Sequence, residues 1–392
     1  MDSERRQGLD LLQAAHVRRL CPLIFCRLRL DGHLDLVRLV EAVHRSCRYV
    51  PQVLWAYDFR RGLFQDRGLT AGRAVHLCRG AVGGGGPWDL GAGPQIQIHV
   101  RREGGQDAVT VGVSHILCDG AGFLQYLYLL SSLYNGETPP DGLCNRRSLP
   151  RRLGGCPSRA IPVPGPSLPL EPGDVSACLT APLGPAEFQA LRAKAGAEGV
   201  TLNDAFLAAY AQVAAGLLGA ERLVLPCPAD LRRLLPGPAG LTVANLTGMY
   251  RVAVEPAPSF PTTLERVHGE MCRQKARRSC CAGLPLLRRA ARVLPPGPLR
   301  GLIRRFYRLS PVSYSNLGEI DAARLRFDGC AVRACFLSGA CRTAPDFQLT
   351  VSTFQGTCTL SSALTASRSG LTQGRNVLES VRRELTQWAP VS

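Results

Sequence analysis

A proline-rich stretch near the middle of the chain limits what this sequence can fold into more than any other feature. Residues 157–172 read PSRAIPVPGPSLPLEP. Proline has no backbone N–H and fixes φ, so this stretch cannot hold a helix or a central strand, and we expect an extended connector. On either side the chain of 392 residues is long enough to bury a hydrophobic core. The sequence predicts an N-terminal half over 1–156, a connector over 157–173 and a C-terminal half over 174–392.

Helical and strand patterns alternate in both halves. In the first half the spacing of apolar residues predicts a helix over 34–47 and strands over 53–59, 95–100 and 108–114. In the second half we expect strands near 175–180, 223–227, 242–254, 312, 332–337, 347–354 and 357–362. Helices are expected there over 185–197, 202–218, 373–388 and in the arginine-rich region 262–308. Strands and helices mixed in both halves indicate an α/β or α+β fold.

The composition is that of a globular protein, with 45% hydrophobic and 20% charged residues. The first ten residues, MDSERRQGLD, do not resemble the apolar core of a signal peptide. The most apolar helical stretch, 202–218, is interrupted by Asn203, Asp204 and Gln212, which favours a buried helix over a membrane span. We therefore expect a cytoplasmic monomer without a membrane-spanning segment.

Sixteen cysteines are scattered along the chain without any CxxC pair, and Cys280–Cys281 is a poor arrangement for a metal or a disulfide. Reduced core residues are the expected interpretation, and no metal site is predicted. The formal net charge is +17, and nearly all of the basic residues are arginines spread along the chain. The arginine bias is typical of GC-rich coding and suggests a bacterial source. Without a basic block and interleaved aromatics, nucleic-acid binding is not expected, and an anionic cofactor or acidic carrier fits the charge better.

One segment, 111–122 (VGVSHILCDGAG), places a histidine where a strand gives way to a helix. Alternating valines precede His115, and apolar residues at helical spacing follow Asp119 and Gly120. A neutral imidazole can take a proton from an alcohol or amine near neutral pH. The alternative is a histidine satisfied within the core. An H-x-x-x-D-G match arises by chance only about 0.03 times in a chain of this composition, which favours a functional role.

Ser114 to Gly120 (SHILCDG) resembles the HHxxxDG motif of the thioester-dependent acyltransferase superfamily. That superfamily includes chloramphenicol acetyltransferase, condensation domains of nonribosomal peptide synthetases, plant BAHD acyltransferases, wax ester synthases and alcohol acetyltransferases. Further stretches resemble other family segments in the same order, namely 201–209 (TLNDAFLAA), 229–235 (ADLRRLL), 245–248 (NLTG) and 314–320 (YSNLGEI). The resemblance thus covers nearly the whole chain.

The resemblance implies two chloramphenicol-acetyltransferase-like halves that form a pseudo-dimer with a central channel. His115 would be the general base that deprotonates the acceptor for direct attack on a thioester, without an acyl-enzyme intermediate. Asp119 would be structural and would pair with an arginine, for which Arg232 of the DLR segment is the candidate. Gly120 would permit a tight turn, because a side chain there would crowd the channel.

Five further positions qualify this comparison. Ser114 stands where many family members have the first histidine, a position that varies among alcohol acetyltransferase-like members. Cys118 could be imagined as a nucleophile beside the histidine, but an inert buried thiol is the expected interpretation. Ser315 and Asn316 are candidates to bind the oxyanion or line the channel, with a structural role at a strand end as the alternative for Asn316. Asn245 is expected to be structural.

Three functional hypotheses follow from these features. The first is an acyltransferase that moves an acyl group from acyl-CoA to a small alcohol or amine. The second is a condensation-type enzyme that takes its acyl group from the phosphopantetheine of an acyl carrier protein. The third is a noncatalytic binding member of the fold. The intact His115, Asp119 and Gly120 favour the first two, and no permanently bound cofactor is expected.

Overall fold

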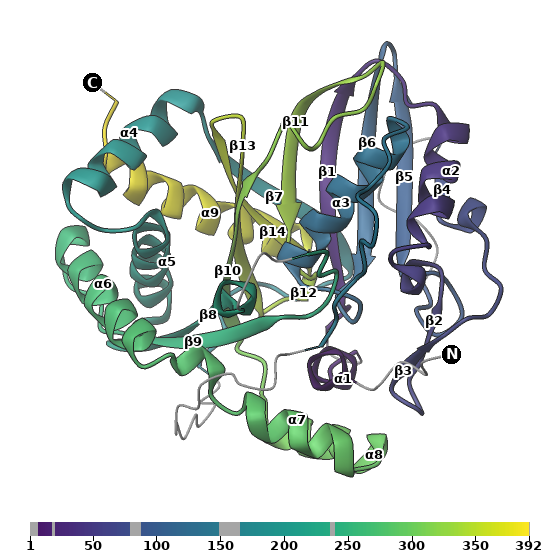
Figure 1. Cartoon of the computed structure of the whole chain (residues 1–392). Helices are drawn as coiled ribbons and strands as arrows, with labels where there is room; N and C mark the ends of the chain where they lie inside the picture. The colour runs from purple at the N-terminus through teal and green to yellow at the C-terminus, as the bar shows by residue number, and fades with distance from the viewer. Residues whose placement is uncertain (1–6, 18–19, 79–87, 149–164, 236–239, 392) are drawn as a thin grey trace.

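The computed structural model describes residues 7–17, 20–78, 88–148, 165–235 and 240–391. Its helices and strands form two lobes that stand side by side, with a small group of helices beneath them (Figure 1). Residues 157–164 of the predicted connector lie outside the described residues. The described part of it, 165–173, has no helix or strand, although Leu168 and Leu170 are buried.

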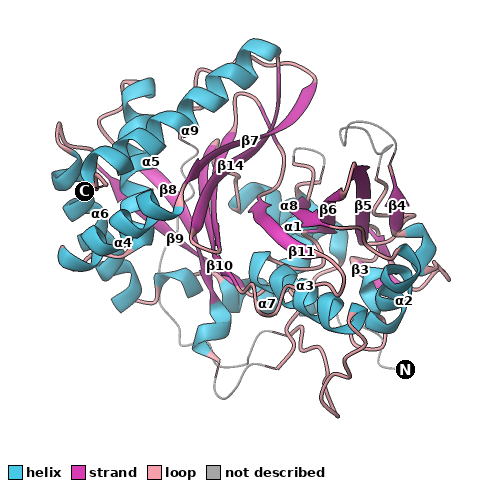
Figure 2. Ribbon diagram, turned by 90° about the horizontal axis from the view of Figure 1, so that it is seen from above, coloured by secondary structure: helices cyan, strands magenta, loops and turns pink. Residues whose placement is uncertain are grey.

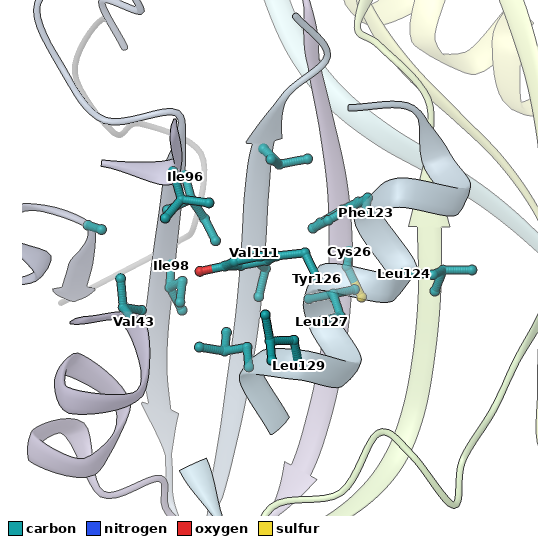
Figure 3. Packing of buried hydrophobic residues seen from close by; sticks show 14 of the residues in the cluster. Cys26, Val43, Ile96, Ile98, Val111, Phe123, Leu124, Tyr126, Leu127 and Leu129 are labelled. Carbon is teal, nitrogen blue, oxygen red and sulfur yellow. The ribbon is translucent and has the colours of Figure 1, made fainter. Parts of the chain in front are cut away.

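The first lobe is built on a five-stranded sheet with the order β11-β1-β6-β5-β4. Its strands are β1 (Leu23–Asp31), β4 (Val75–Leu77), β5 (Ile96–Glu103), β6 (Gln106–Ser114) and β11 (Ala331–Ser338). Helices α2 (Leu36–Ser46) and α3 (Gly120–Tyr134) contact each other and contribute buried side chains to the same core as the sheet. Figure 3 shows Phe123 and Tyr126 of α3 beside Ile96, Ile98 and Val111 of the strands. This core fixes the end of β6 and the start of α3, between which the motif lies.

The second lobe has a sheet with the order β10-β13-β14-β12, in which β7 also pairs with β14. Its strands are β7 (Val175–Leu183), β10 (Val312–Ile320), β12 (Arg342–Thr343), β13 (Phe347–Phe354) and β14 (Thr357–Ala366). Its helices are α4 (Pro185–Ala197), α5 (Leu202–Leu218), α6 (Phe260–Ala276) and α9 (Arg368–Trp388), which lie on the side away from the first lobe (Figure 1). The pair β8 (Leu223–Asp230) and β9 (Thr247–Val254) runs beside β10.

Strand β11 connects the two lobes. It belongs to the second half of the sequence, yet it pairs antiparallel with β1, with Phe25 opposite Ser338 and Asp31 opposite Ala331. The lobes therefore share hydrogen-bonded structure, and Figure 2 shows the two groups of strands next to each other from above. The sequence predicts this strand but does not indicate which sheet it joins.

The smaller elements complete the fold. A third group of helices consists of α1 (Gly8–Ala15), α7 (Leu284–Val293) and α8 (Pro296–Phe306), which share a small apolar cluster below the lobes (Figure 1). The remaining elements are β2 (Ala56–Asp58), β3 (Leu63–Gln65) and the short 3-10 turns at 51–53, 71–73, 231–234 and 279–281. Within the described ranges, no helix combines the length and apolarity needed to cross a membrane.

Two predicted strands are shorter than expected. In the region 53–59 the chain makes a 3-10 turn at 51–53 before strand β2, so only the second part is extended. In the region 242–254 the strand begins at Thr247. The preceding residues cannot join a ladder in the same way, because the carbonyls of Thr242 and Ala244 accept hydrogen bonds from a buried arginine side chain.

Candidate active site

The motif occupies the junction that the sequence predicts. Strand β6 ends at Ser114, and α3 begins at Gly120 with Asp119 as its N-cap residue. Asp119 Oδ1 accepts a hydrogen bond from the backbone N–H of Gly122 at 2.8 Å, which satisfies one of the free donors at the helix start. In the turn between them, the N–H of His115 donates to the carbonyl of Pro22 at 2.6 Å. The backbone that carries the histidine is therefore held on both sides.

Asp119 pairs with Arg232, and both side chains are only 5% exposed. Nη1 of the arginine lies 3.1 Å from Oδ2, and Nη2 lies 3.0 Å from Oδ1. Oδ2 also accepts from the backbone of Leu246 at 2.7 Å and from the hydroxyl of Thr247 at 2.8 Å. Both carboxylate oxygens thus contact donors of the second lobe, while Oδ1 also caps α3 of the first. The motif aspartate acts as a link between the lobes.

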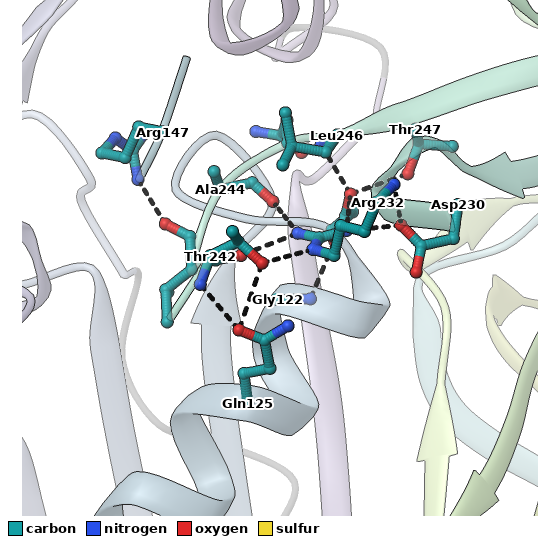
Figure 4. A network of polar contacts seen from close by, with 12 residues as sticks. Gly122, Gln125, Arg147, Asp230, Arg232, Thr242, Ala244, Leu246 and Thr247 are labelled. Carbon is teal, nitrogen blue, oxygen red and sulfur yellow. Dashed lines mark hydrogen bonds and ion pairs between the residues drawn. The ribbon is translucent and has the colours of Figure 1, made fainter. Parts of the chain in front are cut away.

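The remaining donors of Arg232 hold the irregular segment before β9 (Figure 4). Nε donates to the hydroxyl of Thr242 at 2.7 Å, while Nη2 donates to the carbonyls of Thr242 at 2.8 Å and Ala244 at 2.9 Å. Nη1 also reaches Asp230 at 3.0 Å. Burial alone would lower the pKa of Arg232, but the attraction of Asp119 and Asp230 raises it above its usual value. The guanidinium therefore stays charged.

His115 is half-buried, and its Nδ1 is fully buried without a hydrogen-bond partner among the described residues. Burial lowers the pKa of His115 below its ordinary value of 6.5. The negative charge of Asp119 and the Asn245 side chain both act to raise this pKa, but burial has the larger effect. The imidazole is consequently neutral at pH 7. Because Nδ1 is buried, the solvent-exposed surface of this half-buried residue comes from its other atoms.

Asn245 lies behind His115 in a second buried network. Its Nδ2 donates to the carbonyl of Ile116 at 2.9 Å and to Asp10 of α1 at 3.1 Å, while its Oδ1 is buried without a partner in the described part of the chain. An amide oxygen is an acceptor, and a neutral imidazole carries one N–H donor. The two unpartnered atoms, Asn245 Oδ1 and His115 Nδ1, therefore complement each other chemically.

Asp10 and Arg147 complete this network. The carboxylate of Asp10 accepts from Arg147 Nη2 at 2.7 Å, and Nη1 of the arginine donates to the carbonyls of Leu117 at 2.9 Å and Val243 at 2.8 Å. Burial raises the pKa of Asp10, and the arginine opposes that rise. Sequence reasoning misses both residues. The only available signal is one acidic residue among the leucines of a short N-terminal helix.

The contacts of Gly120, Ser114 and Cys118 show what each of these small residues does in the fold, and for Gly120 the reason for glycine differs from the predicted one. Gly120 does not have a left-handed backbone, so the turn itself does not require glycine. A Cβ at this position would lie 2.1 Å from Cδ2 of Leu317, and contact between α3 and β10 is therefore the reason for glycine. Ser114 is buried and accepts from the N–H of Ile116 at 3.2 Å, which supports the turn. Burial raises the pKa of the Cys118 thiol well above its usual value, which disfavours the reactive thiolate.

Ser315 and Asn316 point to opposite faces of β10. Asn316 Nδ2 donates to Asn203 of α5 at 3.4 Å, and its Oδ1 accepts from the N–H of Gly318 at 2.9 Å. The structure therefore does not bring the Asn316 side chain to His115, and the structural alternative fits it better. Because side chains alternate along a strand, Ser315 points to the other face, on which Leu317 meets Gly120.

A separate cavity of about 760 Å³ lies between α4, α6 and α9 in the second lobe, and no residue of the motif lines it.

Comparison with known proteins identifies the architecture. No family model and no curated protein sequence matches the chain. Among solved structures, polyketide synthase associated protein 5 from Mycobacterium tuberculosis is 15% identical, with a TM-score of 0.67 and 99% of both chains covered. The trichothecene 15-O-acetyltransferase from Fusarium sporotrichioides is 11% identical, with a TM-score of 0.70 over 97% of this chain and 93% of that chain.

The first condensation domain of the calcium-dependent antibiotic synthetase is also similar. It is 15% identical, with a TM-score of 0.65 over 99% of this chain and 97% of that chain. These likenesses extend over both lobes, which agrees with the two-lobed arrangement expected from the motif order. The chain therefore has the fold that this condensation domain and this acetyltransferase share.

Proposed function

We propose that the protein transfers an acyl group from a thioester donor to an alcohol or amine, with His115 as the general base. The fold and its motif support acyl transfer as the reaction class. The observation that carries the assignment is the state of His115, whose imidazole is neutral and half-buried at the junction of the two lobes. Asp119 does not compete for this role, because its carboxylate is fully occupied by Arg232 and the segment that follows Ala244.

Asn245 is a positioning residue in this proposal. If His115 carries its proton on Nδ1, directed at Asn245 Oδ1, then Nε2 is the basic nitrogen and is free for the substrate. The tautomer is thereby fixed by an amide rather than by a carboxylate. An amide does not compensate an imidazolium as a carboxylate does, which keeps the resting imidazole neutral. The arrangement is thus suited to a base that accepts a proton only during turnover.

The reaction needs no covalent enzyme intermediate. Nε2 of His115 takes the proton from the acceptor O–H or N–H as the heteroatom attacks the thioester carbonyl carbon. The carbonyl electrons move to oxygen, where the hydroxyl of Ser315 is the candidate donor on the correct face of β10. When the carbonyl re-forms, the C–S bond breaks, and the imidazolium returns its proton to the leaving thiolate. The products are an ester or amide and a free thiol.

The donor is proposed to be acyl-CoA, with an acylated carrier protein as the alternative that the similarity to condensation domains favours. The net charge of +17 suits the phosphates of either donor. The deciding experiment incubates the protein with a set of acyl-CoA thioesters or with acylated carrier protein, each against a panel of alcohols and amines. Products are identified by mass spectrometry, and free thiol is measured in parallel.

The outcomes separate the three hypotheses. Ester or amide formation from acyl-CoA, abolished in His115→Ala, supports the proposed function. Product from carrier protein alone assigns the condensation-type reaction. A thermal shift with coenzyme A that shrinks at high salt, but without turnover, supports a binding protein and rejects the enzyme. Equal product from wild type and His115→Ala rules out the histidine as the base.

A further inference from the structure

The helices α7 and α8 expose large apolar side chains to solvent. Leu286 is 72% exposed, Val293 77%, Leu302 43% and Phe306 67%. Eleven large apolar residues are exposed among those the structure describes, and four of them fall within these two consecutive helices. Single exposed apolar residues are ordinary on protein surfaces, but a local group of this kind marks a binding surface. We call the two helices, residues 284–308 with the following turn, the α7–α8 hairpin.

The same hairpin is strongly basic. It contains seven arginines and no acidic residue, and the sequence between Glu270 and Glu319 has no aspartate or glutamate at all. The arginines are Arg288, Arg289, Arg292, Arg300, Arg304, Arg305 and Arg308. Five of these arginines are exposed, and Nε of one of them, Arg304, donates to the carbonyl of Ala15. In the part of the chain that the structure describes, the other four, Arg289, Arg292, Arg305 and Arg308, form no ion pair. Their positive charge is therefore available to an external partner.

The apolar and basic residues share the outward face. On α7, Leu286, Arg289 and Val293 are three and seven residues apart, and this spacing puts them on one stripe of the helix. On α8, Arg305 and Phe306 lie three and four residues after Leu302, which also places them on one side of the helix. The opposite stripe faces α1, where Ala291, Leu299 and Ile303 are buried with two residues of α1. The fold buries the inner stripe and leaves the large apolar residues of the outer one exposed.

We propose that the α7–α8 hairpin docks the protein on a bilayer surface that contains anionic phospholipids. The helices have 10 and 11 residues, so each is about 15–17 Å long and cannot cross a hydrocarbon core of about 30 Å. They can lie in the interface, with Leu286, Val293 and Phe306 among the acyl chains. Arginine side chains extend along the apolar surface and form bidentate hydrogen bonds to phosphate.

The mixture of residues on this face favours lipid over a protein partner. The buried centre of a protein interface is depleted in charged residues. Here arginine lies between the apolar residues of each stripe, as in helices that rest at the boundary between head groups and acyl chains. The hairpin also stands at the lower edge of the molecule, clear of both sheets, so it can reach a flat surface (Figure 1).

Docking through the hairpin would place the candidate active site close to the lipid surface. Helix α1 lies between the hairpin and the candidate active site, because it packs on α7 and α8 through Leu11 and Ala15 and contributes Asp10 to the network of Asn245. A protein held on the bilayer by this hairpin has its site one helix away from the lipid surface. This consequence alone rests on the proposed function and implies a lipid-soluble acceptor or acyl donor. Docking itself is independent of catalysis.

Vesicle flotation of the full-length chain tests docking without any activity measurement. The vesicles are phosphatidylcholine alone, or phosphatidylcholine with about 30% phosphatidylglycerol, at about 0.15 M salt. We expect the protein to float with the anionic vesicles, to bind the neutral ones at least about tenfold more weakly, and to lose binding as salt is raised. A wild-type protein that stays at the bottom with both vesicle types overturns the proposal.

Two groups of variants locate the surface. Val293→Ser combined with Phe306→Ser should lower the partition coefficient about tenfold, because both side chains leave the acyl region. Val37→Ser is the matched control, since Val37 is 79% exposed on α2, and it should bind as wild type does. Binding that is equally reduced in the control, or unchanged in the double variant, contradicts a docking role for the hairpin.

The charge is tested by replacing Arg289 and Arg305 with glutamine, against the same change at the exposed Arg192 and Arg383. Each hairpin arginine should contribute about fivefold to anionic-vesicle binding, and the control pair should contribute little.

Sedimentation velocity on wild type and the apolar double variant tests whether a second copy of the protein covers this face instead of lipid. A wild-type dimer that dissociates in the variant, together with no vesicle binding, assigns the face to a second copy and rejects the lipid proposal.

Discussion

The carboxylate of Asp119 and the guanidinium of Arg232 meet through two pairs of atoms, at 3.0 and 3.1 Å, although the residues are 113 positions apart in sequence. One begins helix α3 of the first lobe, and the other follows strand β8 of the second. The pair therefore joins the lobes directly behind the turn that carries His115. Its role follows from this location. It holds the start of α3 against Arg232 and the segment that leads into β9.

Asp119→Ala should lower the free energy of unfolding by about 3–5 kcal/mol, because it leaves the buried Arg232 charge without its main partner. The expected result is a much lower melting temperature or insoluble protein. Arg232→Ala should have a similar effect, since it strands the carboxylate instead. Chemical denaturation followed by circular dichroism measures both changes.

Asp230→Ala is the control for this pair. Asp230 also contacts Arg232, at 3.0 Å, but its side chain is 31% exposed, so its removal should cost much less than removal of Asp119. The double variant Asp119→Ala with Arg232→Ala should be less destabilised than the sum of the single variants, because the two side chains interact. Strict additivity would contradict a direct energetic role for the pair.

His115→Ala should stay folded and lose about 10²- to 10⁴-fold in acyl-transfer rate, which is the usual range for removal of a general base. Nδ1 of the side chain has no hydrogen-bond partner within the geometric limits among the described residues, so the melting temperature of the variant should lie close to that of wild type. Rates with the acyl donor identified in the substrate screen, measured beside circular dichroism, check both statements. Retention of more than about half of the wild-type rate would exclude His115 as the base.

The pH dependence of the rate should reflect the buried state of this histidine. Burial lowers the pKa of His115 below 6.5, so the rate should rise with pH and reach its plateau at a lower pH than it would with an exposed imidazole. For stability the sign is the same. The unfolded chain binds the proton more readily, so His115 lowers the free energy of unfolding as pH falls through 6.5 towards its folded pKa. His115→Ala should remove this contribution from the pH profile of unfolding.

Local signals predict the elements of this fold well. Helices α4 and α5 begin and end where the sequence pattern predicts, because each has a clear start signal. Pro185 occupies the first turn of α4, and Thr201 and Asp204 form a reciprocal capping box at the start of α5 with hydrogen bonds of 3.2 Å. The candidate site is identified by a motif that lies within 12 consecutive residues, 111–122.

The sequence does not predict which elements pair when they are far apart along the chain. The alternation in β11 predicts a strand, yet nothing local states that it joins β1 more than 300 positions away rather than β10 or β13. Asp10 has the same difficulty. It looks like a surface residue on a short helix, and only the fold shows that Arg147, 137 positions away, accompanies it in the interior. Asn245, expected to be structural, gains its proposed role only from the buried atoms around it.

Asn245→Ala should move the acid limb of the rate profile to lower pH, because the Asn245 side chain raises the pKa of His115. The rate at the plateau should fall about tenfold, the equivalent of one lost hydrogen bond to the imidazole. A residue that only supports the fold would lower the melting temperature without moving the limb. Asn203→Ala is the control, since that amide contacts Tyr314 and Asn316 instead, and it should leave the limb in place.

Gly120→Ala should lower the free energy of unfolding by about 1 kcal/mol, because the added methyl would lie 2.1 Å from Cδ2 of Leu317 and that leucine side chain must move. Leu317→Ala in the same chain should restore part of that loss, which identifies the contact between α3 and β10 as its cause. The control is Gly216→Ala in α5, where nothing lies within 4 Å of the added methyl. It should stabilise the helix by up to about 1 kcal/mol. The measurement is the melting temperature of Gly120→Ala, Leu317→Ala, the double variant and Gly216→Ala. No rescue by Leu317→Ala would mean that glycine is needed at this position for another reason.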